Sequence, residues 1–235
     1  AATTLSYRPM LAQLPQLLIQ DPASVFARDE AGHERHVERG MNVRGSGFSH
    51  DKFFSDLDDV FVAIFDAEPI SAQPCFVVDM GSGDGTLLRR VYRLVAERTR
   101  RGAVLEQYPL TLVAADFNER ALDEVRRTLH GLPHVTVRGD IGDPAGLMAE
   151  LRRLGIRDPD TVLHVRTFMD HDRPYVPPAD AAALGRRSER RYETLAVAED
   201  GQRIAPAALV QSLVEHLRRW AAPDVMGKHG LLLAE

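Results

Sequence analysis

A run of residues that could do chemistry, Asp170 to Arg173 (DHDR), stands where the apolar segment TVLHVRTF ends. Carboxylates and imidazole serve as general bases and as ligands of divalent metals. Neighbouring residues of a regular strand point to opposite faces, so Asp170 and His171 could act together only where the chain turns. The run is either a solvated loop or the reactive edge of an enzyme. Asp172 and Arg173 within it form either a local ion pair or a clamp for a carboxylate.

A glycine-rich turn follows an earlier apolar segment, in VVDMGSGDGTL. Gly81, Gly83 and Gly85 let the backbone adopt positive φ and approach a ligand closely, with Asp79 just before them. A dinucleotide site requires G-x-G-x-x-G, and here Thr86 stands in place of the third glycine. A phosphate-binding P-loop is excluded, because no Gly-Lys-Ser/Thr follows.

Acidic residues end the next two apolar segments, with Asp116 in VAADFN and Asp140 in RGDIGD. A carboxylate such as Asp116 can accept two charge-assisted hydrogen bonds from a ribose diol, which neither Asn nor Ser would match. Each aspartate taken alone could instead be a turn residue or a helix cap. The order and spacing of all four motifs indicate a single ligand site.

Together these motifs resemble those of class I S-adenosylmethionine-dependent methyltransferases. The resemblance implies an α/β fold with a Rossmann-like, mostly parallel sheet and an N-terminal helical lid segment. It places catalytic residues after the fourth strand, in TFMDHDRPY. The residues that it implies for S-adenosylmethionine binding are Asp79, Gly81, Gly83, Asp116, Phe117, Asp140 and Ile141.

The stretches NVRGSGFSHDKFF, HVRTFMDHDRPY, GQRI, LVEHLRRW and KHGLLLAE resemble a smaller group. This group comprises metal-dependent C-methyltransferase domains beside GNAT-like decarboxylase domains in polyketide synthase loading modules of the gephyronic acid, apratoxin and saxitoxin type. The resemblance implies methylation of the α-carbon of a malonyl or methylmalonyl group on the phosphopantetheine of an acyl carrier protein. Iron or manganese would stabilise the enolate. It implies His171, Asp170 and Gln202 as metal ligands, and His171, Asp170 and Arg166 as catalytic residues.

Three other functions stay open on sequence alone. A metal-dependent O-methyltransferase acting on a catechol-like diol would need no carrier protein. A non-catalytic scaffold domain is disfavoured because the cofactor motifs are intact. A nicotinamide oxidoreductase is disfavoured by Thr86.

Alternating strand and helix patterns must position these motifs. Apolar strands between helices imply a parallel sheet covered on both faces. In the fourth strand His164 and Arg166 would share one face, which hints at a polar cavity there. Strands are expected over 75–80, 110–116, 134–140, 161–168 and 230–235, and helices over 86–101, 119–130, 144–155 and from 206 onward.

The flanking segments are less regular. Residues 21–50 are mostly polar and end in a glycine-containing loop before an amphipathic helix over 53–65. Ser46, His50 and Lys52 lie in or just after that loop, and form either an active-site wall or an N-cap arrangement.

Near the other end, the segment 176–205 is rich in Ala and Arg and predicts a mobile flap. His216 is expected on a helix surface, and His229 in a turn.

Length and composition limit the possible domain organisation, partners and location of the protein. The 235 residues suffice for a helical lid segment over 1–70 and a cofactor-binding core over 71–235. The net charge of −5 argues against nucleic-acid binding, and Cys75, the only cysteine, excludes an intrachain disulfide. Because neither a membrane-spanning run nor a signal-peptide pattern is present, we expect a cytoplasmic location.

The strand count departs from the family pattern. Class I methyltransferases usually have seven strands, and five are expected here. Either the last strands lie outside this sequence, or the sequence, which starts with Ala, is part of a longer protein. An exposed fifth strand would be an edge prone to pairing with other chains.

Overall fold

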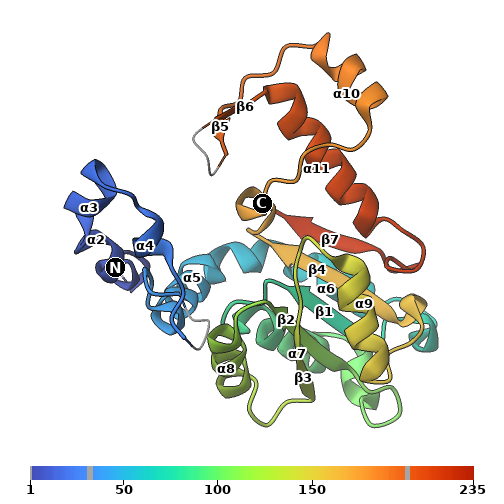
Figure 1. Cartoon of the computed structure of the whole chain (residues 1–235). Coiled ribbons are helices and arrows are strands. Elements are labelled where there is room, and N and C mark those ends of the chain that lie inside the picture. Colours follow the sequence, from blue (N-terminus) through green and yellow to red (C-terminus); the bar gives the residue numbers. More distant parts are fainter. Residues whose placement is uncertain (1, 31–33, 199–201) are drawn as a thin grey trace.

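The computed structural model describes residues 2–30, 34–198 and 202–235. Its centre is a five-stranded parallel sheet in the order β3-β2-β1-β4-β7 (Figure 1). The predicted Rossmann-like α/β class is confirmed. The strand order reverses between β1 and β4, which is where open α/β sheets bind ligands. The strands are β1 (Phe76–Met80), β2 (Thr111–Asp116), β3 (His134–Arg138), β4 (Val162–Thr167) and β7 (Leu231–Ala234).

Alternating side chains give the sheet two faces, and helices cover both. Val77 and Leu163 lie in a buried cluster with residues of α6, α7 and α8. Val78 and Val162 lie in a second cluster with residues of α9 and α11. The apolar runs predicted from the sequence are therefore buried on both sides. The covering helices are α6 (Asp58–Phe65), α7 (Thr86–Arg98), α8 (Glu119–Thr128), α9 (Pro144–Arg153) and α11 (Pro206–Trp220).

A helix replaces the glycine-containing loop that the sequence predicted, since α5 spans Arg39–Phe54. The glycines were misread as loop formers, whereas they allow close packing. A Cβ on Gly47 would lie 2.4 Å from Asp84 Oδ1, and one on Gly45 would lie 2.8 Å from the backbone nitrogen of Thr3. Their absence of side chains lets α5 approach both the turn after β1 and the first helix. The preceding helices are α1 (Ala2–Ser6), α2 (Arg8–Leu11), α3 (Leu14–Ile19) and α4 (Ala23–Phe26).

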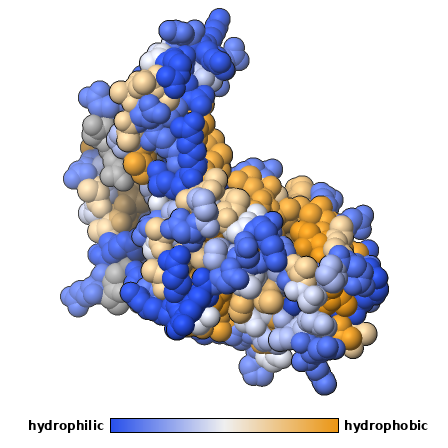
Figure 2. All heavy atoms as spheres, turned by 90° about the vertical axis from the view of Figure 1, so that its right-hand side faces the viewer, coloured by the Kyte–Doolittle hydropathy of each residue, from blue (hydrophilic) through white to orange (hydrophobic). Residues whose placement is uncertain are grey.

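The segment predicted as a flap contains α10 (Ala181–Ser188) and a hairpin of β5 (Ala196–Val197) and β6 (Arg203–Ile204). With the start of α11 it forms an arm that projects from the sheet (Figure 1), and hydrophilic atoms cover much of its visible face (Figure 2). His216 on α11 is buried, so its predicted place on a helix surface was wrong. Within the three described ranges, no helix combines the length and apolarity needed to cross a bilayer.

Candidate active site

The glycine turn after β1 has the conformation that its sequence predicted. Gly81, Gly83 and Gly85 have φ values of 79°, 56° and 82°, in the left-handed region that favours glycine. The N–H of Gly81 donates to the carbonyl of Ala115 on β2 at 2.8 Å. A Cβ on Gly81 would lie only 3.0 Å from the Met169 side chain. The turn is thus fixed between β2 and the residues that follow β4.

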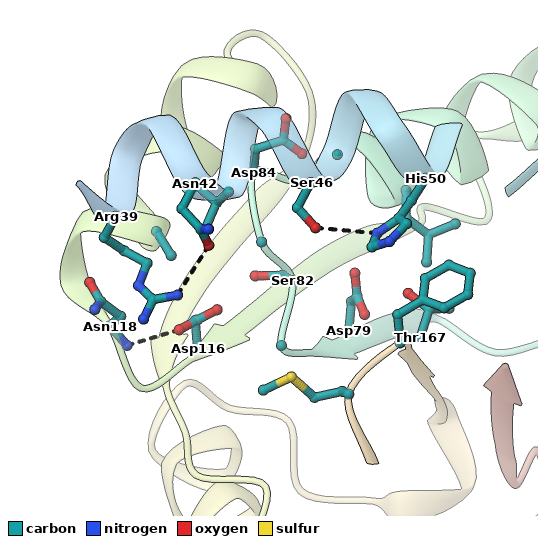
Figure 3. A pocket seen from close by; sticks show the side chains of 18 of the residues that line it. Arg39, Asn42, Ser46, His50, Asp79, Ser82, Asp84, Asp116, Asn118 and Thr167 are labelled. Carbon is teal, nitrogen blue, oxygen red and sulfur yellow. Dashed lines mark hydrogen bonds between the residues drawn. The ribbon is translucent and has the colours of Figure 1, made fainter. Parts of the chain in front are cut away.

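A cavity of about 200 Å³ opens above this turn, between the carboxyl ends of β1, β2 and β4 and the helix α5. Figure 3 shows Asp79 rising from β1 toward α5, with Asp116 below Arg39. Five of the predicted cofactor residues therefore line this cavity: Asp79, Gly81, Gly83, Asp116 and Phe117. Its lining includes Arg39, Asn42, Ser46, His50, Asp79, Gly81, Gly83, Asp116, Phe117, Asn118, Thr167, Phe168 and Met169.

Two buried carboxylates make this cavity attractive to a cation. Asp79 Oδ1 has no hydrogen-bond partner among the described residues. Burial, and then the nearby charge of Asp116, raise the pKa of Asp79 to about 7. Burial also raises the pKa of Asp116 to about 6, although N–H donors of Asn118 and Gly83 and the charge of Arg39 oppose the shift. A positively charged ligand would stabilise the ionised forms of both carboxylates.

The N-terminal segment is fastened to the rim of this cavity through Glu34. Arg39 on α5 binds Glu34 in a fork, with its Nε 2.8 Å from Oε2 and its Nη2 2.6 Å from Oε1. The side-chain amide of Asn118, which follows β2, donates to Glu34 Oε2 at 2.9 Å. Glu34 therefore joins three separate parts of the chain around Asp116.

A second cavity of about 790 Å³ adjoins the first and shares Arg39, Phe117 and Met169 with it. Asp140 and Ile141, the two predicted adenine contacts, line this second cavity. The predicted cofactor residues therefore line two cavities that share three residues of their walls. Their roles stay predictions, because geometry alone does not test binding.

The helix α5 forms one wall of the cavity. Ser46 and His50 line it, and Ser46 Oγ lies 3.3 Å from His50 Nδ1. Of the two sequence interpretations, the active-site wall is the one that the structure supports. The N-cap interpretation was wrong, because α5 begins at Arg39. Lys52 instead lies over the ring of Phe53, 4.5 Å from its centroid.

The chain turns sharply after β4. Phe168 has φ of 53°, a left-handed conformation that costs a non-glycine residue about 1–2 kcal/mol. Its N–H donates to the carbonyl of Ala234 at 2.8 Å. Its ring stacks on that of His50, with 4.2 Å between centroids and 30° between planes. The turn continues into the short 3-10 helix Asp170–Asp172, so the change of direction that adjacent Asp170 and His171 required is present.

His171 pairs with a residue that the sequence did not single out. His171 Nδ1 lies 2.9 Å from Glu235 Oε2, while Glu235 Oε1 accepts hydrogen bonds from the N–H groups of Met169 and Asp170. Burial would raise the pKa of Glu235, but the hydrogen bonds, from His171 foremost, keep it below its usual value. His171 keeps 66% of its side chain exposed, so it is free to meet a substrate. The only sequence signal for Glu235 was its position at the end of KHGLLLAE.

Arg166 and Asp170 form a buried ion pair beneath the turn. Arg166 Nε lies 2.6 Å from Asp170 Oδ2 and Nη2 lies 3.0 Å from Oδ1, with the guanidinium 4.6 Å from the ring centroid of Trp220. His216 Nε2 lies 3.2 Å from Asp170 Oδ1. Burial would raise the pKa of Asp170, but the nearby His216 and Arg166 outweigh burial, so the pKa is lowered. His164 shares this face as predicted, but Trp220 fills the expected polar cavity.

The Arg166 side chain lies away from the space in which a substrate could bind. Its side chain is fully buried, and among the described residues neither Arg166 nor His171 lines the first cavity. Arg166 holds Asp170, and through the backbone the adjacent His171, rather than facing a substrate. The structure therefore places Arg166 beneath the turn as the partner of Asp170, and a catalytic role for it stays a prediction.

The predicted metal ligands do not converge. The carboxylate of Asp170 is occupied by Arg166, as described above. Gln202 precedes β6 in the hairpin, which Figure 1 shows projecting away from the sheet. No group of three or more His, Cys, Asp or Glu side chains within the described ranges could hold a metal ion. His171, Asp170 and Gln202 thus do not fit an iron or manganese site in this conformation.

Comparison with known proteins identifies the chain's relatives. Residues 34–235 match the family model described as the AprA MT2-like domain. No curated protein matches the chain. Solved structures with partial similarity include an O-methyltransferase family protein from Burkholderia thailandensis (16% identity, TM-score 0.42, 99% of this chain and 51% of that one). Others are a putative methyltransferase from Thermobifida fusca YX (15%, 0.35, 86% and 72%) and human N-acetylserotonin methyltransferase in complex with SAM (15%, 0.26, 96% and 57%). The chain spans about half the length of the Burkholderia protein.

Proposed function

The chain belongs to the family of AprA MT2-like methyltransferase domains, and from this premise we propose that it is an S-adenosylmethionine-dependent C-methyltransferase. The proposed acceptor is the α-carbon of a malonyl or methylmalonyl thioester, carried by the phosphopantetheine of an acyl carrier protein. The observation that carries the proposal is the His171–Glu235 pair, which Met169 links to a cavity holding two carboxylates of raised pKa. The N–H of Met169 donates to Glu235, and Met169 lines the cavity. A neighbouring GNAT-like domain in the same synthase is part of the proposal.

The cavity has the chemistry that the cofactor requires. Asp79, buried and with an unpartnered oxygen, suits the ammonium and sulfonium groups of S-adenosylmethionine. Asp116 can accept from both ribose hydroxyls, and Asp140 with Ile141 would flank the adenine. When bound, S-adenosylmethionine supplies the methyl group: the new carbon–carbon bond forms to its methyl carbon as the methyl–sulfur bond breaks, which releases S-adenosylhomocysteine.

The His171–Glu235 pair has the arrangement of a general base with an orienting carboxylate. Because Glu235 accepts a hydrogen from Nδ1, the lone pair of His171 is left on Nε2. That nitrogen would remove the proton from the α-carbon, and the electron pair of the broken C–H bond would move onto the thioester oxygen. The α-carbon of the resulting enolate is the nucleophile.

The predicted metal adds nothing to this mechanism. No metal-dependent step follows from the geometry, because Asp170 would first have to leave Arg166. A metal-assisted reaction would therefore require a rearranged turn after β4. A chelator distinguishes the two forms of the reaction directly.

The deciding experiment is mass spectrometry of malonyl-loaded carrier protein incubated with S-adenosylmethionine and the protein, with and without EDTA. We expect a gain of one or two methyl groups that persists in EDTA and is lost in His171→Gln. A mass gain that is abolished by EDTA would show that the reaction requires a metal ion. Cofactor binding without any gain on the carrier protein, together with methylation of a catechol-like diol, would replace the C-methyltransferase by an O-methyltransferase.

A further inference from the structure

We propose that His50 is a second catalytic residue, which donates a hydrogen bond from Nε2 to the thioester carbonyl oxygen of the substrate while His171 removes the α-proton. The inference rests on the proposed function and deepens it. It gives His50 the role of stabilising the negative charge that develops on the carbonyl oxygen. His50 lies on α5, in a segment that the sequence predicted as a loop, and not at the end of a strand.

The position of His50 is the first support. It lies on α5, on the wall opposite the glycine turn, and its ring faces the same hollow as Asp79 and Thr167 (Figure 3). His171 is close enough that its charge, after burial, is the second cause lowering the pKa of His50. His50 on α5 thus lines the cavity, and His171 in the turn after β4 lies within electrostatic reach of it.

The fixed orientation of the ring is the second support. Phe168 stacks on one face of His50 at 4.2 Å, and Phe54 meets the ring edge-on at 6.2 Å. The backbone of Phe168 has φ of 53°, a strained conformation for a residue with a side chain. Strained residues persist where the surrounding structure over-determines them, and they cluster at active sites. A core ring that merely filled space would not need this arrangement.

The hydrogen bonding of the ring gives the third support. Ser46 Oγ lies 3.3 Å from Nδ1, and when its hydroxyl donates there, the proton of the neutral ring sits on Nε2. No other described residue hydrogen-bonds to Nε2, so this N–H is available to a ligand. Burial, with His171 nearby, lowers the pKa of His50, which favours the neutral ring near pH 7.

The chemistry balances without a further reactant. The α-proton passes to His171 Nε2, the electron pair of the C–H bond moves to the thioester oxygen, and His50 stabilises the oxyanion without giving up its proton. When the α-carbon forms its new bond to the methyl group, the pair returns and the carbonyl is restored. His171 then releases its proton to solvent, to which its side chain is exposed.

The test compares three variants with the wild type in the carrier-protein assay and in exchange of the substrate α-proton for deuterium without S-adenosylmethionine. His50→Phe keeps the stacked ring but removes the donor, and we expect both rates to fall by about 100-fold. His50→Gln keeps a donor and should recover part of the loss. His130→Phe makes the same change at an exposed residue after α8 and should behave as wild type.

The outcomes separate this inference from the proposed function. If wild type methylates the carrier-bound substrate and His50→Phe stays within about threefold of it, the inference is overturned while the function stands. If wild type itself neither methylates nor exchanges, the proposed function fails. Melting temperature and S-adenosylmethionine affinity must be unchanged in His50→Phe. If either quantity changes, deuterium exchange is measured in Ser46→Ala instead. A loss of exchange in that variant supports the role of His50 as a hydrogen-bond donor, and exchange at the wild-type rate contradicts it.

Discussion

The two ends of the candidate site differ in the kind of sequence information that specifies them. The cofactor end, formed by Asp79, the glycine turn and Asp116, comes from short motifs at the ends of adjacent strands. The β4 end, formed by Phe168 to His171 with His50 and Glu235, brings together segments up to 185 positions apart, from residue 50 to residue 235. The cofactor end is therefore fixed by local backbone geometry, and the β4 end by tertiary packing.

The largest expected effect tests whether the β4 end is the catalytic one. Glu235→Gln keeps a hydrogen-bonding side chain but removes the charge that orients and supports His171, so methyl transfer should fall by about 100-fold to 1,000-fold. S-adenosylmethionine affinity should stay at the wild-type value, because Glu235 does not line the cofactor cavity among the described residues. Single-turnover kinetics and calorimetry measure the two quantities. Glu106→Gln, an exposed control, should change neither, and a Glu235→Gln variant of wild-type rate would remove the pair from the mechanism.

The second effect tests how the β4 end is held. Arg166→Met leaves the buried carboxylate of Asp170 in contact with His216 but without its guanidinium partner, which should lower the free energy of unfolding by about 3–5 kcal/mol. Arg153→Met, at an exposed ion pair, should lower it by less than about 1 kcal/mol. Denaturation with urea measures both. A loss at Arg166 no larger than at Arg153 would mean that the buried pair is not what supports the turn.

How far the sequence could predict each end follows from this contrast. The strands, the glycine turn and the places of Asp79 and Asp116 were predicted correctly, because local motifs and apolar periodicity determine them. The helix α5 was missed because Gly45 and Gly47 resemble a loop, and only the contacts with Thr3 and Asp84 explain them. His216 was misplaced because only its tertiary contact with Asp170 reveals that it is buried, and the only sequence signal for Glu235 was its position in KHGLLLAE.

The third effect tests the cofactor end through pH. The pKa of Asp79 is raised to about 7 in the folded chain, so its contribution to stability is present at low pH and is lost as pH rises through 7. The melting temperature of the free protein should therefore fall between about pH 4 and pH 7 and level off above that, and the fall should be steeper than in Asp79→Asn.

Binding should show the opposite trend, because S-adenosylmethionine requires the ionised carboxylate. Its affinity should rise by up to about tenfold per pH unit below pH 7 and then level off. Calorimetry at several pH values measures this. A pH-independent affinity in wild type, equal to that of Asp79→Asn, would show that Asp79 does not meet the cation.

The smallest effect tests whether the N-terminal segment belongs to the cofactor end. Glu34 is ionised, because the hydrogen bond and charge of Arg39 lower its pKa despite burial. Glu34→Gln keeps the shape but weakens the fork from Arg39 and the bond from Asn118, at a cost of about 1 kcal/mol. Since these bonds surround Asp116, S-adenosylmethionine should dissociate about threefold to tenfold faster, which stopped-flow fluorescence can measure. Glu38→Gln, an exposed neighbour, should leave the rate unchanged. Equal dissociation rates in Glu34→Gln and wild type would mean that the segment before α5 does not help to retain the cofactor.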